Sequence, residues 1–366
     1  MKKLAYIDAL RGFAVVLVII VHSSQCGINN YGDVINRILS KAHYGVQLFY
    51  IASAFTIFLS YSNRINKEHS PAKNFFLRRF FRIAPMFYIT IIYYSWQSNS
   101  WSDDFPDTYY SSTLSHIFFL HGLSPYWINS IVPGGWSIAV EMLFYLLIPF
   151  LFYHIQNLNA SIIFFLISLL FQYTINTFFI HFPLIENEDV WRNFLYYYFP
   201  NQLPVFALGI ILFHWIQNKN AVFNTEPLIL LLISILVFTQ FYLEIIFIPN
   251  FIFISAGFVL FAYYLSTQKN SFFVNPVITF IGKVSYSMYL IHFAVLEFMI
   301  RLGVTDIFNN GNHYTLNFIL RLCIVTIVTL TISTIFYYTV EKPMQKVGSK
   351  IIERLENRQI FSRKTL

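Results

Sequence analysis

Apolar residues recur along this 366-residue chain in long runs, and the short stretches between the runs carry most of its charges. An α-helix of about 20 apolar residues crosses a hydrocarbon core about 30 Å thick. The pattern therefore predicts an all-α polytopic membrane protein with about ten transmembrane helices. We expect them near residues 9–27, 44–61, 83–97, 136–154, 160–180, 194–215, 227–244, 248–266, 284–301 and 316–339.

Composition supports this interpretation and orients the chain. Only 11% of the residues are charged, whereas a soluble domain has about 25%. The net charge of +7 then reflects positive-inside bias rather than nucleic-acid binding. An even number of spans places both termini on one side, which we predict to be cytoplasmic because it holds most of the lysines and arginines. The other side keeps Arg37, Lys41, Arg192, Arg301 and Arg321.

Three stretches depart from simple spans. Residues 98–135 contain the apolar run SHIFFLHGL, which is too short to cross a membrane. We interpret this stretch as an outer or re-entrant segment covering a cavity, the alternative being a pair of short spans. Pro200 and Pro204 are expected to bend or interrupt the sixth span. We predict a transmembrane domain over residues 1–344 and a charged cytoplasmic tail over residues 345–366.

The first apolar segment carries Asp8, Arg11 and His22. Arg11 and His22 are eleven positions apart, which returns them to within about 20° of one helix face and separates them by about 16 Å. If Arg11 lies at the cytoplasmic surface, His22 lies near the bilayer midplane, where a polar side chain indicates function. Asp8 lies within helical pairing distance of Arg11. The alternatives are a packing role for His22 and a helix-terminus charge effect for Asp8.

A basic run, FFLRRFFRIAP, precedes the third span. Arg78, Arg79 and Arg82 offer forked donors that suit phosphate, and the spacing of Arg79 and Arg82 places those two on one face of a helix. The run favours an anionic ligand, although positive-inside anchoring explains one or two of its arginines.

The fourth span opens with PGGWSIAVEMLFY. Trp136 is expected to anchor this helix at the membrane interface, and Glu141 lies about 8 Å deeper. Glu141 and His22 can then reach a similar depth, where the carboxylate would orient the imidazole as a general base. The alternative pairs Glu141 with an arginine for structure alone.

The last two spans carry weaker candidates. In IGKVSYSMYLIH of the ninth span, Ser285, Tyr289 and His292 share one helix face. A structural role is favoured for His292 over a catalytic one. Glu341, which with Pro343 closes the tenth span, is expected to pair with an arginine that follows the second span.

Two other classes of site find no support in the sequence. Cys26 and Cys323 are the only cysteines and form no metal or redox motif. No metal-spaced histidine cluster occurs either, so no metal is predicted. Lys2 and Lys3 before an apolar run imitate a signal peptide, but Arg11 interrupts the run, and we interpret it as a retained helix.

Taken together, these motifs resemble acyltransferase family 3, the membrane O-acyltransferases that acetylate O-antigens, peptidoglycan, Nod factors and antibiotics. The resemblance runs from Ile7 to about Met344. It rests on five motifs in the family's order, namely Arg11-x10-His22, Arg79-x-x-Arg82, WSIAVEMLFY, GKVSYSMYLIH and Glu341-x-Pro343.

The resemblance implies an acyl-CoA donor from the cytoplasm, usually acetyl-CoA, and an acceptor hydroxyl on a glycan or lipid-linked sugar. It also implies that the histidine of the first helix, His22, is essential. Arg11, Arg79 and Arg82 would hold the coenzyme A phosphates, with Asp8 supporting Arg11. His22 would act on the acceptor as a base or carry the acyl group briefly, and the residues leave both roles open. The implied location is a bacterial inner membrane.

Two departures from the family pattern and two rival hypotheses accompany this prediction. Ala54 stands where such proteins often carry glycine, and the fused C-terminal esterase-like domain of some members is absent. That absence favours a stand-alone enzyme or one with a separate partner protein. One rival keeps the fold but transfers a succinyl or longer acyl group. The other is a transporter of an anionic or sugar-bearing lipid, for which the sequence shows no inverted repeat.

Overall fold

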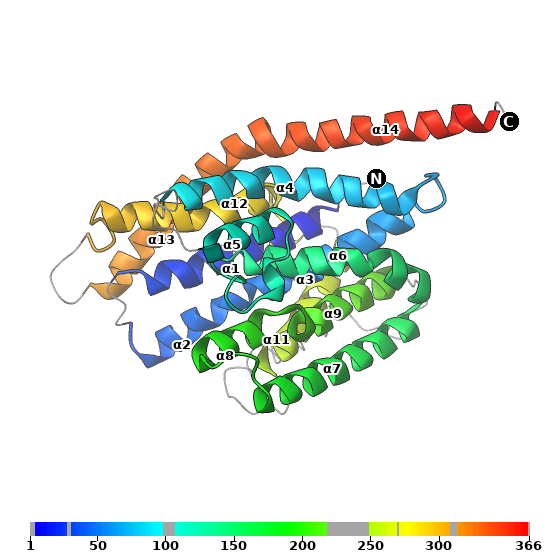
Figure 1. The fold of residues 1–366 in the computed structure, drawn as a ribbon. Coiled ribbons are helices and arrows are strands. Elements are labelled where there is room, and N and C mark those ends of the chain that lie inside the picture. Colours follow the sequence, from blue (N-terminus) through cyan, green and yellow to red (C-terminus); the bar gives the residue numbers. More distant parts are fainter. Residues whose placement is uncertain are drawn as a thin grey trace. The chain divides into compact units, whose positions relative to one another are not determined.

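The computed structural model describes residues 4–27, 31–97, 107–217, 249–268, 271–307 and 313–364. All regular structure within these residues is helical, so the predicted all-α fold is confirmed (Figure 1). The elements are α1 (Ala5–Gln25), α2 (Asp33–Lys41), η1 (Ala42–Tyr44), α3 (Gly45–Ser62), α4 (Pro71–Gln97), α5 (Asp107–Ile117), η2 (His121–Leu123), α6 (Trp136–His154), α7 (Leu158–His181), α8 (Glu188–Tyr197), α9 (Phe199–Gln217), α11 (Asn250–Thr267), α12 (Pro276–Arg301), α13 (Tyr314–Phe336), η3 (Tyr337–Glu341) and α14 (Lys342–Lys364).

Eight helical stretches among the described residues are long and apolar enough to cross a membrane. They correspond to eight of the ten predicted spans. Of the other two, the span near 227–244 lies outside the described residues. The span near 83–97 forms the second part of α4, a helix whose first part is basic. The cytoplasmic orientation of the termini stays a prediction.

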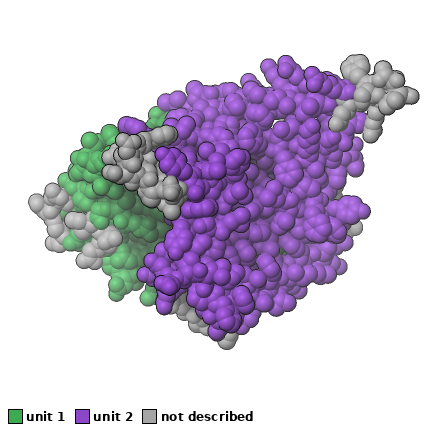
Figure 2. All heavy atoms as spheres, in the orientation of Figure 1, with its two compact units in different colours: residues 1–55, 205–334 green, residues 56–204, 335–366 purple. Residues whose placement is uncertain are grey.

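The chain divides into two compact units, which Figure 2 distinguishes by colour. Unit 1 comprises residues 1–55 and 205–334, and unit 2 comprises residues 56–204 and 335–366. Each unit is thus assembled from segments far apart in the sequence. The predicted division at residue 344 stays a prediction.

Close packing of α1 against α12 organises unit 1 (Figure 1). A Cβ atom on Gly282 would lie 1.6 Å from the carbonyl oxygen of Asp8, and one on Gly12 would lie 2.3 Å from the carbonyl oxygen of Ile278. Only glycine lets two helix backbones approach this closely, as at small-residue contacts between membrane helices. The contact fixes the register of the two helices.

The start of α12 explains why this helix is longer than predicted. The side-chain oxygen of Asn275 accepts hydrogen bonds from the backbone N–H groups of Val277 and Ile278, each at 3.0 Å. Pro276 occupies the first helical position, where its missing N–H costs nothing. The helix therefore begins eight residues before the predicted start at 284, in time to bring Gly282 against α1.

The predicted departure at Ala54 is accommodated by a glycine on a neighbouring helix. A Cβ atom on Gly209 of α9 would lie 2.7 Å from the Cβ of Ala54 and 2.7 Å from the carbonyl oxygen of Ile51 in α3. The α3–α9 contact within unit 1 thus keeps one small residue on each side.

In unit 2, α14 packs along α4 and caps its beginning (Figure 1). The Glu356 carboxylate accepts hydrogen bonds from the backbone N–H groups of His69 (2.8 Å) and Ser70 (3.2 Å) and from the side-chain amide of Asn74 (2.6 Å). A carboxylate at a helix N-terminus satisfies otherwise unpaired N–H groups and complements the helix dipole. The stretch predicted to be a charged tail is therefore helical, and it holds the basic helix α4 in place.

The predicted interruption of the sixth span is confirmed. The helix breaks at Tyr198, between α8 and α9, so that Pro200 lies in the first turn of α9. The backbone at the break is held by Asn201, whose side chain donates to the carbonyl oxygen of Tyr196 (2.8 Å) and accepts from Gln172 of α7 (3.0 Å). Buried side-chain amides replace the missing helical hydrogen bonds here.

Residues 107–135, the described part of the stretch predicted to be an outer or re-entrant segment, form α5, η2 and a loop that leads to α6. Its two histidines, His116 and His121, stack face to face at 3.9 Å between ring centroids. Burial lowers the pKa of His116 to about 3 and that of His121 to about 4, so both rings are neutral at pH 7. Nε2–H of His121 donates to the carbonyl oxygen of Gly135 at 3.1 Å, which ties the segment to the start of α6.

The α1–α12 contact generates the first prediction. Gly282→Ala should lower the free energy of unfolding by about 3 kcal/mol, because the new methyl group would force two backbones apart. The measurement is the thermal unfolding midpoint of the purified protein in detergent. Val277→Ala, on an exposed position of the same helix, serves as the control and should leave the midpoint nearly unchanged. A Gly282→Ala variant as stable as the wild type would contradict the described contact.

Candidate functional site

Two histidines meet in unit 1, where α1 and α12 run side by side. The ring centroids of His22 and His292 lie 5.3 Å apart. The ring of Phe293 lies 4.4 Å from that of His22 and 4.2 Å from that of His292. Ten residues separate Gly12 from His22 and Gly282 from His292, so the glycine contact delivers both histidines to the same level.

The Nδ1 atom of each ring lies at hydrogen-bond distance from an oxygen atom. Nδ1 of His22 lies 3.2 Å from the side-chain oxygen of Gln25, and Nδ1 of His292 lies 2.6 Å from the carbonyl oxygen of Tyr289. An oxygen acceptor requires a proton on each Nδ1, which leaves the lone pair on Nε2. The buried Nε2 atom of His292 has no hydrogen-bond partner among the described residues. The ring of His22 is half-buried, whereas that of His292 is fully buried. Of the two Nε2 atoms, that of His22 is therefore the more accessible base.

The three candidates of α12 occupy the protein interior together. Ser285, Tyr289 and His292 are 4%, 7% and 0% exposed, which agrees with their predicted common face. The ring of Tyr289 packs edge-on against Phe49 of α3 at 5.9 Å. Ser285 and Tyr289 therefore belong to the packing that supports His292.

The predicted pairing of Asp8 with Arg11 is confirmed. The distance from Nη1 of Arg11 to Oδ1 of Asp8 is 3.8 Å, and each side chain is 14% exposed. The carboxylate thus orients the guanidinium at the beginning of α1. Binding of an acyl donor by Arg11 stays a prediction.

Arg321 of α13 is a central residue that the sequence interpretation missed. It is 1% exposed, and its Nε–H donates to the carbonyl oxygen of Ser23, the residue after His22, at 2.7 Å. Its Nη2 donates to the hydroxyl of Tyr31 (2.7 Å), and its Nη1 donates to the carbonyl oxygen of Thr305 (2.9 Å) and faces the Asp306 carboxylate at 3.3 Å. One buried cation therefore joins the end of α1, the segment after it and the turn after α12.

Gly27 closes this junction. Its φ is +68°, and a Cβ atom there would lie 2.4 Å from Nη1 of Arg321 and 2.5 Å from Oδ2 of Asp306. Glycine is therefore required by conformation and by space. A further histidine that the sequence interpretation missed, His43 of η1, lies within electrostatic range of His22.

Unit 2 gathers two other predicted residues around Tyr145. The Tyr145 hydroxyl donates to Oε1 of Glu141 at 2.6 Å, one helical turn away on α6. The guanidinium of Arg79 lies 5.5 Å from the ring centroids of both Phe75 and Tyr145. Arg79 is 8% exposed, and its Nε has no hydrogen-bond partner within the part of the chain that the structure describes. Tyr145 thus contacts the Glu141 carboxylate through its hydroxyl and the Arg79 cation through its ring.

The other two arginines of the basic run, Arg78 and Arg82, differ in their surroundings. Arg78 makes a two-bond contact with the Glu68 carboxylate, at 2.8 and 3.1 Å, and so anchors the loop before α4. Arg82 is half-buried. Glu341 is 3% exposed in η3, a π-helical turn that packs against α4, and its pairing with an arginine stays a prediction.

Trp136 is buried at the start of α6. It is 7% exposed, and its ring is tilted against that of Tyr197 of α8, with 4.5 Å between the ring centroids. An anchoring role of Trp136 at the membrane interface stays a prediction.

The predicted partnership of His22 with Glu141 joins residues of different units and stays a prediction, because each unit is described by itself. The same holds for a joint phosphate site of Arg11, Arg79 and Arg82. Within the described ranges, no group of three His, Cys, Asp or Glu side chains is arranged to hold a metal ion.

Comparisons with known proteins agree with these motifs. A family model described as an acyltransferase domain matches residues 4–338. The chain is similar to "Putative O-acetyltransferase SACOL0978" of Staphylococcus aureus strain COL, with 25% identity over 96% of this chain and 59% of the relative. It is 24% identical to "Putative O-acetyltransferase SAS0844" of strain MSSA476 over the same shares. The chain thus spans 59% of the length of these relatives. No solved structure matches it significantly.

The buried arginine generates a stability prediction. Arg321→Ala should destabilise the protein by about 3–5 kcal/mol, because it removes the cation that faces the Asp306 carboxylate and the donor to the carbonyl oxygens of Ser23 and Thr305. Thermal unfolding in detergent measures the loss. Arg301→Ala is the matched control, because it removes an exposed ion pair with Glu297 and should cost less than about 1 kcal/mol. Equal effects of the two substitutions would show that the junction around Arg321 is not important for folding.

Proposed function

The chain belongs to acyltransferase family 3, and on this premise we propose that it is a multi-pass membrane O-acetyltransferase. The donor is acetyl-CoA from the cytoplasm, and the acceptor is a hydroxyl of a cell-surface glycan or lipid-linked sugar. The observation that supports this proposal most is the half-buried His22, whose Nδ1 is engaged by Gln25 and whose ring lies beside His292. An imidazole with its tautomer fixed on one side and a basic nitrogen on the other is suited to proton transfer.

In the proposed reaction, Nε2 of His22 takes the proton of the acceptor hydroxyl while the hydroxyl oxygen attacks the thioester carbonyl carbon. The new C–O bond forms, the C–S bond breaks, and the coenzyme A thiolate leaves and takes up the proton from His22. Gln25 keeps the Nδ1 proton in place throughout. His292 positions the His22 ring by packing.

Nε2 of His22 would also be the nucleophile if the histidine carried the acetyl group. In that case the acetyl group moves first to the nitrogen and then to the acceptor, with release of coenzyme A before the acceptor binds. The base role requires the acceptor in the same step. Release of coenzyme A without acceptor therefore separates the two roles.

Arginines are proposed to hold the donor. Coenzyme A has a polyanionic head, and guanidinium groups bind phosphate through paired hydrogen bonds. Arg11 in unit 1 and Arg82 in unit 2 are half-buried and can offer their donors, whereas Arg79 is buried against aromatic rings. We therefore assign direct phosphate contact to Arg11 and Arg82, and a supporting role to Arg79.

Family membership favours an enzyme over a transporter, and the names of the relatives favour acetyl over succinyl or a longer acyl group. We propose the cytoplasmic membrane of a bacterium as the location, with both termini in the cytoplasm. No metal takes part in the proposed reaction.

His22→Ala should abolish acetyl transfer, because no other group would take the acceptor proton. Membranes containing either form are supplied with radiolabelled acetyl-CoA and total cell glycans, and label is counted in the base-labile glycan fraction. His154→Ala, an exposed histidine at the end of α6, is the control and should retain activity. Wild-type activity in the His22 variant, at equal protein level, would exclude the proposed role. A burst of coenzyme A without glycan would favour the acyl-carrier route.

Arg11→Ala should raise the apparent KM for acetyl-CoA about tenfold or more, since it removes a charge-assisted contact to phosphate. Initial rates at varied acetyl-CoA give KM and kcat separately. Arg192→Ala, an exposed arginine on α8, is the charge-matched control. An unchanged KM with a lowered kcat would assign Arg11 to the reaction centre instead of the donor site.

A further inference from the structure

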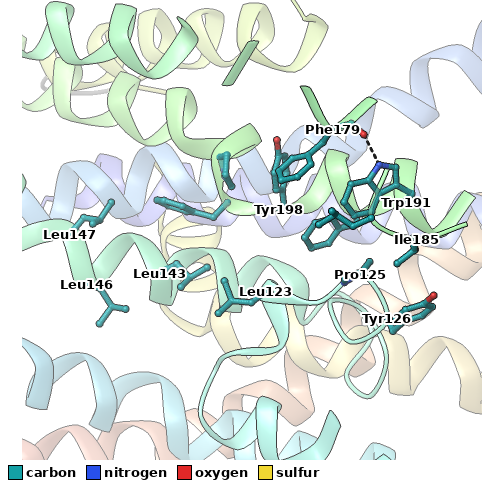
Figure 3. Close-up of a pocket in the computed structure, with 15 residues that line it drawn as sticks. Leu123, Pro125, Tyr126, Leu143, Leu146, Leu147, Phe179, Ile185, Trp191 and Tyr198 are labelled. Carbon is teal, nitrogen blue, oxygen red and sulfur yellow. Dashed lines mark hydrogen bonds between the residues drawn. The ribbon is translucent and has the colours of Figure 1, made fainter. Parts of the chain in front are cut away.

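Unit 2 contains a cavity of about 600 Å³ that the proposed chemistry does not use. Its volume falls within the range of about 300–1,000 Å³ that is typical of small-molecule sites. It is lined by η2 and the segment that follows it, by one face of α6, by the end of α7 with the turn to α8, by α8 and by the break between α8 and α9 (Figure 3). The lining residues include Leu123, Leu143, Leu147, Phe179, Trp191 and Phe194.

The walls of this cavity present mainly carbon, and two of their polar side chains, Trp191 and Tyr198, are paired within the protein. Nε1–H of Trp191 donates to the carbonyl oxygen of Phe179 at 2.8 Å, the bond drawn in Figure 3. The Tyr198 hydroxyl donates to the side-chain oxygen of Asn176, on α7. A cavity whose walls are mainly apolar selects a hydrocarbon over a polar ligand.

A smaller pocket of about 270 Å³ adjoins the cavity and shares Pro125 and Tyr126 with it. Its other lining residues are Ile128, Asn129, Ser130, Val190, Asn193 and Tyr197. The side chain of Asn193 is exposed and makes no hydrogen bond to the described residues, so its amide can both donate and accept. Amides, hydroxyls and tyrosine rings suit a ligand with several hydroxyl groups.

None of the residues that line the smaller pocket is charged. A phospholipid head carries a phosphate and is recognised by arginine or lysine. An uncharged polar pocket therefore favours a sugar over a phospholipid head. The apolar cavity beside it favours a hydrocarbon chain attached to that sugar.

We propose that these adjoining pockets bind a lipid-linked sugar, with the hydrocarbon chain in the larger cavity and the sugar in the smaller pocket. The proposal rests on the proposed function, since it identifies the acceptor as an amphiphile rather than a free glycan. The ring of Tyr197, in the smaller pocket, contacts that of Trp136, and Glu141 lies five residues after Trp136 on α6. The proposed sugar site thus borders the helix that carries Glu141.

Photolabelling tests the site without any acyl donor. The full-length protein is placed in nanodiscs of phosphatidylethanolamine and phosphatidylglycerol and irradiated with a dodecyl glucoside that carries a diazirine in its chain. Labelled peptides are identified by mass spectrometry. Label should fall within residues 122–147 or 179–200, and unmodified dodecyl glucoside should compete, whereas glucose and dodecylphosphocholine should not.

Cavity-filling variants give the matched comparison. Leu147→Trp, at a position 36% exposed, should lower labelling about tenfold by occupying the chain site, and Leu143→Trp should do the same from a deeper position. Leu166→Trp, on a 56% exposed position of α7 that does not line the cavity, should leave labelling unchanged. If Leu143→Trp does not fold, the labelling of Leu147→Trp still tests the proposed chain site.

Labelling elsewhere, labelling insensitive to Leu147→Trp, or equal competition by dodecylphosphocholine would overturn the proposal. The last result would indicate a phospholipid site. Transfer of acetyl to dodecyl glucoside and to glucose is measured separately on the wild type. Specific labelling without transfer would count against the proposed function but not against the site. Transfer with equal kcat/KM for both sugars, together with non-specific labelling, would count against the site alone.

Discussion

The contact between α1 and α12 is the constraint on which unit 1 depends. Two backbones approach so closely at Gly12 and Gly282 that a side chain on either would collide with a carbonyl oxygen of the partner helix. Such a contact has one register, because a shift by one residue would place a Cβ atom where only hydrogen fits. Equal spacing along the two parallel helices then converts the glycine register into the meeting of His22 with His292. The proposed reaction centre is thus positioned by packing about 15 Å away.

A second constraint fixes the other end of the same helix. Arg321 binds the carbonyl oxygen of Ser23, directly after His22, and neutralises Asp306 in the interior. A buried cation without such partners would be very costly, so its presence requires all of its partners at once. With the glycine contact at one end and Arg321 at the other, α1 can neither slide nor rotate. A proton-transferring side chain needs this degree of fixation, since a displacement of about 1 Å can lower the rate about a hundredfold.

Much of the fold could be predicted because a membrane span can be recognised from the composition of its own segment. Residues 136–154 were predicted as a span, and α6 has these same bounds, because polar loops flank a continuous apolar run. The start of α4 was missed because its first turns are basic and give no apolar signal, although a proline at position 71 marks its beginning. Within the candidate site, the Asp8–Arg11 pair was predictable because it is local to one helix. The junction of Arg321 was not, because its partners lie up to 298 residues away and share no periodicity.

Differences in charge explain how the protein would distinguish the acyl donor from the acceptor. A donor with a phosphate-rich head is best recognised by cations, and the half-buried arginines lie on α1 and α4. An acceptor sugar carries hydroxyls and no charge, and the pocket beside the apolar cavity of unit 2 is lined by amides, hydroxyls and rings. Each type of surface penalises the wrong ligand: phosphate finds no counter-charge in the uncharged pocket, and a neutral sugar does not compensate a desolvated guanidinium. Electrostatics alone can therefore provide selectivity between donor and acceptor, without any contribution from shape complementarity.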